Sequence, residues 1–421
     1  MVKIPKINPR DFDYHLPPER IAQFPLENRD ASKLLICSDQ VVTEDIFSNI
    51  GDYIPSESLL VFNDTKVIHA RLIFSKTTGA TIEIFCLSPL SPAQELHDAF
   101  KQTSGCIWKC LVGNVKRWKG ELLKKEFIHL GEKYVLFAHR KENLGDGCFA
   151  VEFHWEPENR SFLDIIEFAG LVPLPPYITR AAADLDAIRY QTLYAQNEGS
   201  VAAPTAGLHF TKNVLQSLRQ KKCLFENITL HVGIGTFRPV SSPDISAHIM
   251  HNEQISVMKN TIITVLENLG KPLIAVGTTS VRTLESLYWS GVRLLIDGND
   301  IHPEVQQWDP YQERYEQDIS VEKALTALVE YLDRKKLSGY SGTTQLMILP
   351  GYKFRFPDGI LTNFHMPQST LLMLVSAFIG EKWRTAYDFA RQHDFRFLSY
   401  GDACLFFKAK SYFDAGNNVT Y

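Results

Sequence analysis

The sequence predicts an α/β protein with a small all-β module inserted into it. At 421 residues the chain is too long for one ordinary core, so we expect two domains or one large barrel with an insertion. Between about residues 70 and 155, polar and apolar residues alternate with a period of two, which is typical of strands. On both sides, apolar strand patterns alternate with helical patterns, as in α/β domains. Residues 1–69 and 156–421 are therefore expected to form a discontinuous main domain around the module, residues 70–155.

The composition is that of an ordinary globular protein, with 45% hydrophobic and 22% charged residues. The formal net charge of −4 excludes a globally basic nucleic-acid binder, although it leaves room for a local basic patch. Residues 1–10 lack the apolar core of a signal peptide, and no later run is apolar for long enough to cross a membrane. We therefore expect a cytoplasmic protein with no membrane contact. Its seven scattered cysteines are expected to be reduced thiols.

The first segment of the main domain carries two apolar strand patterns. Residues 12–25 predict a proline-marked turn and a short helix, and residues 33–37 then predict a buried strand. Residues 58–63 predict a second strand, which runs directly into polar residues. Open α/β sheets bind ligands where strands end in such loops. Asn63 and Asp64 are therefore candidates for a site.

The inserted module is predicted to be a small closed barrel. Its short strand patterns lie at residues 71–74, 80–87, 107–112, 134–137 and 148–155. So many short strands would leave exposed edges unless the sheet closes. Residues 116–125 are the densest basic stretch of the chain and contain Trp118. A solvated hairpin is the ordinary interpretation of this stretch, and a surface that contacts phosphate groups is the alternative.

Residues 229–240 form an apolar strand pattern that runs into a loop of glycine, threonine and arginine. Gly233 and Gly235 let the backbone approach a ligand closely, while Thr236 and Arg238 add a hydroxyl and a guanidinium at the carboxyl end of the strand. A dinucleotide-binding loop would need a third glycine at the position of Arg238. The stretch therefore predicts a turn that binds an anion or a carbonyl group.

Three other strand-to-helix loops have a similar layout, at residues 201–211, 274–286 and 360–378. Their polar or glycine residues are Thr205, Gly207 and His209 in the first, Thr278, Thr279 and Ser280 in the second, and Asn363, His365 and Ser369 in the third. Hydroxyls at a helix N-terminus suit an anionic or carbonyl-bearing ligand, and simple helix capping is the alternative. Residues 297–317 predict a surface loop, and Asp402 lies in a tight turn near the end.

Histidines are the candidates for acid–base chemistry or metal binding. A single histidine is more often a hydrogen-bonded structural residue than a catalytic one. His248 and His251 would share one face of a helix with Glu253 nearby, which hints at a zinc site, although the His-Glu-x-x-His order is absent. The sequence also lacks the Gly-x-Ser-x-Gly elbow, the Walker loop and the kinase motifs, which excludes the commonest hydrolases and nucleotide-triphosphate enzymes.

Taken together, these stretches resemble one family, the S-adenosylmethionine:tRNA ribosyltransferase-isomerases of queuosine biosynthesis. The resemblance runs from Phe12 to Phe406. Its motifs include, in order, residues 63–66, 70–72, 173–178, 190–195, 203–211, 230–240, 277–282, 362–375 and 399–403. The chain is longer than most members, with extra sequence at residues 91–106 and 297–317.

The resemblance implies an enzyme that transfers the ribosyl group of S-adenosylmethionine to the 7-aminomethyl-7-deazaguanine base at the tRNA wobble position and isomerises it. The products would be epoxyqueuosine-tRNA, adenine and methionine. S-adenosylmethionine would be consumed as a substrate, with no permanently bound cofactor and no metal. The partner would be a tRNA with a GUN-type anticodon that carries the deazaguanine precursor, and we expect a monomer. The family also implies a barrel-like α/β main domain with the small β-barrel inserted.

The resemblance further implies roles for residues in the matching motifs. The proton-transfer groups would be His231 and His209, which we place first, followed by His365, Glu253 and Asp402. The methionine carboxylate and ribose hydroxyls would be held by Thr236, Arg238, Thr278, Thr279, Ser280 and Arg282. Asn63, Asp64 and Asn363 would read the polar edge of a base. The remaining substrate residues would be Arg71, Thr205, Gly207, Gly233, Gly235 and Ser369. The tRNA would contact Lys116, Arg117, Lys119, Lys124 and Lys125, with residues 219–222 as second choice.

Two alternatives from other classes stay open at the level of sequence. A metal-dependent hydrolase would use His248, His251 and Glu253 and would contain stoichiometric zinc. A non-catalytic tRNA-binding protein would bind tRNA without releasing adenine.

Overall fold

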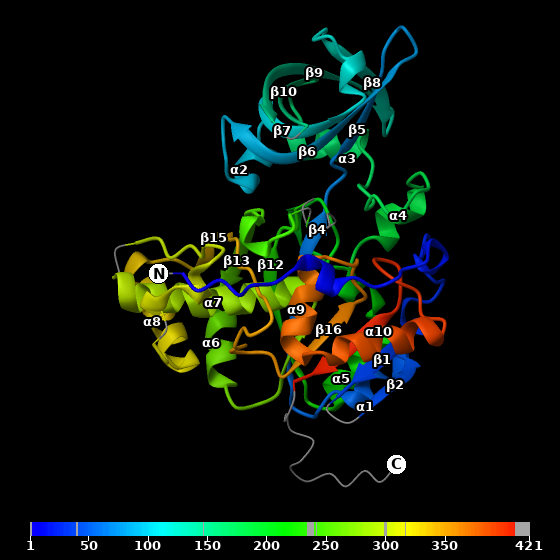
Figure 1. Cartoon of the computed structure of the whole chain (residues 1–421). Helices are drawn as coiled ribbons and strands as arrows, with labels where there is room; N and C mark the ends of the chain where they lie inside the picture. The colour runs from blue at the N-terminus through cyan, green and yellow to red at the C-terminus, as the bar shows by residue number, and fades with distance from the viewer. Residues whose placement is uncertain are drawn as a thin grey trace.

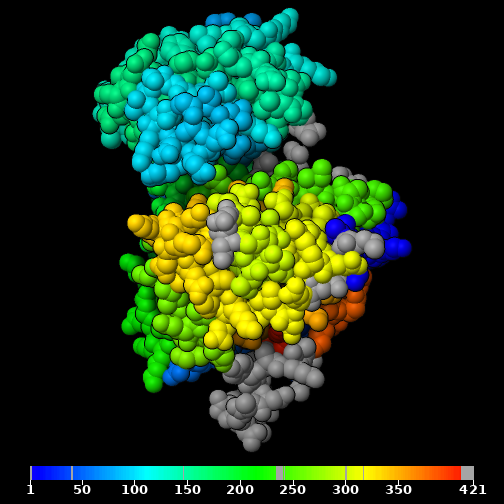
Figure 2. Space-filling view, turned by 90° about the vertical axis from the view of Figure 1, so that its left-hand side faces the viewer, coloured from blue at the N-terminus to red at the C-terminus, as the bar shows by residue number. Residues whose placement is uncertain are grey.

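The computed structural model describes residues 2–38, 41–145, 147–233, 240, 242–298, 301–315 and 317–408. Strands β5 to β10 form an upper lobe, and a large sheet with its helices forms a lower lobe (Figure 1). Figure 2 shows the same two lobes from the side, the upper one in blue to green. Within the described ranges, none of the helices is both long and apolar enough to cross a membrane.

The lower lobe is built on a nine-stranded mixed sheet. In spatial order its strands are β15 (Gly339–Thr344), β13 (Glu253–Met258), β12 (Leu224–Leu230), β3 (Leu59–Asn63), β14 (Leu273–Val276), β16 (Gly359–Asn363), β17 (Ala403–Phe407), β1 (Lys33–Cys37) and β2 (Val42–Ile46). The apolar strands β14 and β17 are buried along their whole length, as expected when both faces of a sheet are covered. Among the described residues the end strands β15 and β2 do not pair. The expectation of a barrel-like main domain is therefore corrected to an open mixed sheet.

Helices cover both faces of this sheet. One face carries α6 (Lys259–Glu267), α7 (Thr278–Asp297), α8 (Val321–Lys335), α9 (Thr370–Ile379) and α10 (Lys382–Gln392), which share one large apolar core. The other face carries α1 (Ile50–Tyr53) and α5 (Lys212–Gln220). Helices α7 and α8 approach closely at Gly291, where an added Cβ would lie 2.0 Å from the carbonyl oxygen of Ala324.

Residues 297–317, predicted to be a surface loop, are irregular in the part that the structure describes and are anchored in the core by single buried residues. Val305 and Tyr315 are buried in the large core, and Val305 bridges to Thr344 at the end of β15. Asp309, at the start of the short helix η9 (Asp309–Tyr311), is also buried. This segment therefore covers the edge of the core.

The upper lobe is a six-stranded antiparallel sheet with its own core. In spatial order its strands are β5 (Arg71–Ser75), β6 (Thr81–Ser91), β7 (Cys106–Gly113), β10 (Cys148–Glu156), β9 (Glu132–Gly145) and β8 (Leu123–His129). Buried and half-buried residues alternate along most of β7, which confirms the predicted strand period there. The end strands β5 and β8 contact each other without pairing, so the barrel is nearly closed.

Two short helices accompany this barrel. Helix α2 (Leu96–Phe100) lies within the extra segment at residues 91–106 and packs its Phe100 ring on Trp108. Helix α3 (Phe162–Ala169) adds its apolar face to the barrel core, although it lies beyond residue 155. The domain limits at residues 70 and 155 stay a prediction.

Candidate active site

The carboxyl ends of four neighbouring parallel strands gather most of the polar loops that the sequence singles out. Strands β12, β3, β14 and β16 run parallel in this spatial order. They end at Leu230, Asn63, Val276 and Asn363. The loops that follow them therefore meet at one edge of the sheet, where open α/β sheets bind their ligands.

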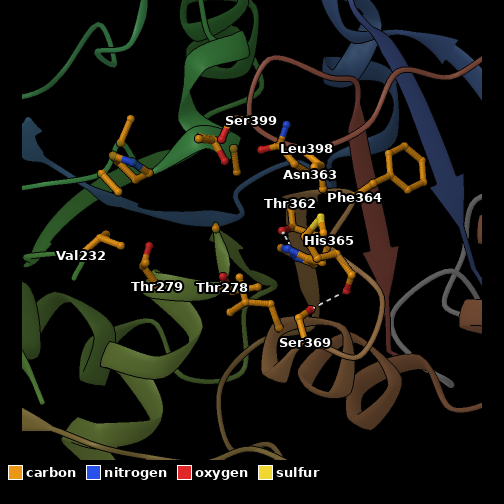
Figure 3. Close-up of a pocket in the computed structure, with 18 of the residues that line it drawn as sticks. Val232, Thr278, Thr279, Thr362, Asn363, Phe364, His365, Ser369, Leu398 and Ser399 are labelled. Carbon is orange, nitrogen blue, oxygen red and sulfur yellow. Dashed lines mark hydrogen bonds between the residues drawn. The ribbon is translucent and has the colours of Figure 1, made fainter. Parts of the chain in front are cut away.

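A pocket opens at this edge (Figure 3). Its walls come from the short helix η6 (Thr205–His209), the start of α7, the segment after β16 and the turn at residues 398–399. Six residues that were expected to bind substrate or transfer a proton line it: Thr205, Thr278, Thr279, Asn363, His365 and Ser369. The structure thus brings three separate predicted loops into one site.

The first turn of α7 presents backbone amides to this pocket. Gly277 precedes the helix with φ of +92°, a conformation that favours glycine. In the described part of the chain, the amides of residues 278–280 have no acceptor, and no side chain caps this end of the helix. The positive end of a 20-residue helix therefore faces the pocket, which suits a carboxylate.

Two polar oxygens at the pocket are buried without a partner. Neither Thr279 Oγ1 nor Asn363 Oδ1 bonds to any group that the structure describes. Asn363 is only 3% exposed, and its Nδ2 donates to His209 Nε2 at 3.1 Å. Because an unpaired buried polar atom is costly, these two oxygens point to a ligand that would bond to them.

His365 contributes an imidazole to the pocket. Its Nε2 lies 3.0 Å from Thr362 Oγ1 (Figure 3). Its amide donates to the Tyr387 hydroxyl, and its carbonyl accepts from the Tyr14 hydroxyl. Burial lowers the pKa of His365 to about 3, so the imidazole is neutral near pH 7. A neutral imidazole in a pocket can accept a proton or a hydrogen bond.

His209 lies behind the pocket wall. Its Nε2 accepts from Asn363, and its Nδ1 lies 2.8 Å from Ser32 Oγ. Burial, followed by the charge of Arg396, lowers the pKa of His209 to about 3. Both ring nitrogens are therefore used inside the fold. A role as proton carrier stays a prediction, and this geometry favours the positioning of Asn363.

His231 lies beside the pocket, whereas its neighbour Val232 lines it. The ring packs against a small two-stranded sheet of β4 (Thr65–Val67) and β11 (Asn197–Ser200). Its Nδ1 is 2.8 Å from Thr65 Oγ1, and a Cβ added to Gly199 would lie 2.8 Å from the ring. Burial lowers the pKa of His231 to about 4. The imidazole is thus held neutral at the rim.

A buried ion pair anchors the loop that follows His231. Glu253 accepts from the guanidinium of Arg282 and, through Oε1, from the amide of Gly233 at 3.2 Å. The structure therefore brings three predicted site residues together, but they fix the backbone beside the pocket and do not line it. Gly235, Thr236 and Arg238 lie outside the described residues.

Asn63 and Asp64 are used within the fold. The Asn63 side chain donates to the carbonyl of Leu230 and accepts from its amide, which ties β3 to β12. The Asp64 carboxylate accepts from the Thr229 hydroxyl at 2.7 Å and from Asn197 Nδ2 at 3.0 Å. A role in reading the edge of a base stays a prediction for Asn63 and Asp64, and this geometry favours a structural role.

The side chains of Asp402 and Ser280, and the position of Gly207, are also engaged within the fold. Asp402 accepts from the amides of Lys33 and Arg396, and the Ser280 hydroxyl donates to the carbonyl of Val276. A Cβ on Gly207 would lie 1.9 Å from the hydroxyl oxygen of Tyr194, so packing and not a ligand requires this glycine. None of these three residues lines the pocket.

The upper lobe holds the remaining predicted residues. Arg71 pairs with Glu83 within the barrel sheet, away from the pocket lining. Lys124 pairs with Glu126, and Lys125 donates to the carbonyl of Ala169. Arg71, Lys124 and Lys125, which were expected to contact a ligand, thus already have partners within the protein.

The basic stretch has a different arrangement at its start. Lys116, which lies in the short helix η5 (Val115–Arg117), and Lys119 line a surface pocket together with Arg140 and Lys141. The side chain of Arg117 has no hydrogen bond or ion pair in the described part of the chain, and its carbonyl accepts from Lys76. This end of the stretch can contact a partner.

The zinc interpretation of His248, His251 and Glu253 is wrong. The short helix η8 ends at Ala247, and His248 is extended with ψ of 132°, so the two histidines do not share a helix face. Glu253 lies in β13 and is paired with Arg282. The described residues contain no group of three or more His, Cys, Asp or Glu that could hold a metal ion.

Sequence reasoning missed three hydroxyl-bearing residues that line the pocket: Tyr177, Thr362 and Ser399. The hydroxyls of Tyr177 and Ser399 lie 2.7 Å apart. All three residues fall within motifs that carry the family resemblance, at residues 173–178, 362–375 and 399–403. Membership in those motifs was the only signal in the sequence that could have pointed to these three residues.

Known proteins match the chain over nearly its whole length. A family model described as queuosine biosynthesis protein matches residues 9–406. The S-adenosylmethionine:tRNA ribosyltransferase-isomerase of Trichlorobacter lovleyi is 36% identical over 94% of this chain and 98% of the relative. The protein of the same name from Aromatoleum aromaticum is 38% identical over 93% and 95%. A crystal structure of an S-adenosylmethionine tRNA ribosyltransferase from Thermotoga maritima aligns with 29% identity and a TM-score of 0.45, over 94% of this chain and 99% of that one.

Proposed function

The chain belongs to the queuosine biosynthesis protein family, and from this premise we propose that it is an S-adenosylmethionine:tRNA ribosyltransferase-isomerase. It transfers the ribosyl group of S-adenosylmethionine to the 7-aminomethyl-7-deazaguanine base at the tRNA wobble position and isomerises it. Epoxyqueuosine-tRNA, adenine and methionine are the products. The reaction takes place in the pocket at the carboxyl ends of β12, β3, β14 and β16.

The observation that supports this pocket most directly is its set of unused polar groups. The free amides at the start of α7 suit the methionine carboxylate, since a helix N-terminus attracts anions. Thr279 Oγ1 and Asn363 Oδ1 then offer hydrogen bonds to the ribose hydroxyls or to the adenine amino group. S-adenosylmethionine carries a carboxylate, hydroxyls and an amino-substituted base, which matches these groups.

Proton transfer in this pocket falls first to His365. The positive sulfonium acidifies the adjacent ribose carbon, so a base must take a proton there, and an acid must protonate the departing adenine. His365 lines the pocket, and burial, which lowers its pKa to about 3, keeps the imidazole unprotonated at neutral pH, as a base has to be before the step. His231 at the rim is the second candidate. His209 acts on the reaction through Asn363, which it holds in place.

The tRNA binds across the upper lobe through the pocket of Lys116, Lys119 and Arg140, in which Lys141 is already paired with Glu152. The guanidinium of Arg140 lies 5.7 Å from the ring centre of Trp118 and 5.5 Å from that of Phe149. Cations over aromatic faces form surfaces that suit phosphates and stacked bases. Net charge is −4, so such a local patch has to supply the attraction for RNA.

Replacement of Lys116 and Lys119 together by Gln should weaken tRNA binding and reduce the slope of log K against log salt by about two units, because each phosphate contact contributes about one. Fluorescence anisotropy at several salt concentrations measures this slope. Lys124→Gln is the matched control, since its charge is already paired with Glu126. A slope unchanged in the double variant would exclude this surface.

We also propose that the enzyme works as a cytoplasmic monomer on tRNA with a GUN-type anticodon, and that it needs no metal. The family resemblance supports these points. The geometry of His248, His251 and Glu253 favours no metal-dependent hydrolase.

The decisive activity assay incubates the protein with S-adenosylmethionine and with tRNA that carries the aminomethyl-deazaguanine base. We expect free adenine and methionine in equal amounts, formed only when this tRNA is present. A protein that binds tRNA but releases no adenine would be the non-catalytic alternative.

A further inference from the structure

A second pocket lies directly behind the wall of the active site and is lined by three arginines. Arg29 comes from the short helix η3 (Arg29–Ala31), Arg189 from the end of α4 (Asp184–Arg189), and Arg396 from the segment before β17. These segments are far apart in sequence but meet at the edge of the lower lobe, near α4 in Figure 1. We call this site the arginine pocket.

The arginine pocket carries an excess of positive charge. The guanidinium of Arg29 donates to the carbonyls of Gln191, Leu208 and Ile188, and none of its contacts in the described part of the chain is a carboxylate. Burial, followed by the charge of Arg189, lowers the pKa of Arg29. A negatively charged ligand between these two cations would relieve this repulsion.

Arg189 and Arg396 retain capacity to bind a ligand. Arg189 donates to the carbonyls of Leu26 and Glu27, but its Nε is buried without a partner among the described groups. Arg396 lies 3.5 Å from Asp402, whose carboxylate also accepts from two backbone amides. Spare guanidinium N–H groups are the donors that bind a phosphate in a fork.

The arginine pocket adjoins the active site. Ser399 lines both pockets. His209 lines the arginine pocket and accepts from Asn363, which lines the active site. A ligand group in the arginine pocket is therefore separated from the active site by a single layer of side chains.

An exposed aromatic ring lies next to the arginine pocket. Phe24 is 61% exposed, and its carbonyl accepts from Arg396 Nη1. Arg180 lies over its ring at 4.3 Å, while the charge of Arg180 is neutralised by Asp186. Aromatic rings beside arginines are the surfaces on which unstacked RNA bases pack.

We propose that the arginine pocket binds a backbone phosphate of the tRNA next to the nucleotide whose base enters the active site. This inference rests on the proposed function and adds the anchor for the anticodon strand. The phosphate accepts from Arg189 and Arg396, while the adjoining base can pack on Phe24. The anchor sets the register of the strand, so that the wobble base and no neighbour faces His365.

The test uses the full chain and an anticodon stem-loop RNA with a GUN anticodon. Arg189→Gln and Arg396→Gln should each raise the Kd for this RNA roughly tenfold and lower the salt slope by about one unit. Arg189→Lys should restore the slope, which a purely structural arginine would not show. Arg10→Gln removes the same charge from an exposed side chain that has no hydrogen bond or ion pair to the described residues, and it should leave both values unchanged.

A neutral methylphosphonate placed in turn at each phosphate that flanks the wobble nucleotide identifies the contact. At one position the neutral linkage and Arg189→Gln should not be additive, because each removes the same interaction. Additive effects at every position would overturn the proposal. A raised KM for S-adenosylmethionine with unchanged RNA affinity would also overturn it, since the arginine pocket would then hold the methionine carboxylate. Adenine release by the wild-type enzyme is measured separately, so failure of the anchor and failure of the proposed function give different results.

Discussion

Thr279 and Asn363 each bury a polar oxygen that has no partner in the described part of the chain, and both oxygens belong to one pocket. Removal of a hydroxyl that the fold does not use should affect the ligand and spare the fold. Thr279→Val keeps the shape of the side chain. We expect at least a tenfold loss in kcat/KM for S-adenosylmethionine, because about one hydrogen bond is lost, with an unchanged or higher melting temperature.

Thr283→Val is the matched control for this prediction. It removes a hydroxyl one turn further along α7 that donates to the carbonyl of Thr279, inside the fold. Steady-state kinetics and thermal unfolding of both variants separate the two roles. Full activity in Thr279→Val would contradict the placement of the substrate against this hydroxyl.

The buried histidines make a prediction about pH and stability. His209 has a pKa of about 3 in the fold, below the ordinary value of 6.5, so the unfolded chain binds its proton more readily. Stability from this neutral histidine is complete above pH 6.5 and is lost as the pH falls from 6.5 towards 3.

His209→Gln should therefore flatten the dependence of unfolding free energy on pH by about 1.4 kcal/mol per pH unit between pH 6 and 4. Urea unfolding of both proteins at several pH values in this range measures the difference. The same measurement on His15→Gln, which changes an exposed histidine, gives the reference slope. Equal slopes in wild type and His209→Gln would refute the buried neutral state.

For single residues, the sequence identified the loops of the site but not the direction in which their side chains point. Asn63 and Asn363 both stand at the end of an apolar strand. The side chain of Asn63 bonds to the backbone of Leu230 in the neighbouring strand. The side-chain oxygen of Asn363, in contrast, has no partner among the described residues and lies at the pocket. The difference depends on the register between β3 and β12, which no local pattern contains.

At the scale of elements, the long helix α7 links the site to the core. Its first turn faces the pocket, and its middle packs against α8 at Gly291. Gly291→Ala should lower the free energy of unfolding by about 1–3 kcal/mol, because the new Cβ overlaps the carbonyl of Ala324. Chemical denaturation measures this change. The control is Glu330→Ala on the exposed side of α8, whose free energy of unfolding should stay within about 0.5 kcal/mol of wild type. An equally small effect of Gly291→Ala would show that α7 and α8 can move apart to accept the new Cβ.

Continuous apolar patterns in the sequence correspond to strands in the structure, as in β3 and β14. Two polar stretches show what such a pattern does not contain. The spacing of His248 and His251 fits a helix but does not cause one, and the chain there is extended. Residues 297–317 look polar, yet single buried anchors at Val305 and Tyr315 attach the segment to the core.

At the scale of the whole molecule, the change of hydrophobic period near residues 70 and 155 predicted a separate β barrel, and the six-stranded upper lobe has this form. Closure of the main sheet could not be predicted in this way. It depends on whether β15 and β2 meet, and these strands are far apart in the sequence. The two proposed RNA-binding sites, the basic surface of the upper lobe and the arginine pocket of the lower lobe, would have one tRNA contact both lobes.

We propose that this chain moves the ribosyl group of S-adenosylmethionine onto the wobble base in the pocket at the strand ends. The most direct measurement uses S-adenosylmethionine with carbon-13 in every ribose position, followed by mass spectrometry of the wobble nucleoside. The wild-type enzyme should give a nucleoside that has gained all the labelled ribose carbons, and Asn363→Ala should give much less of it. A wobble nucleoside without label after incubation with the wild-type enzyme would contradict the claim.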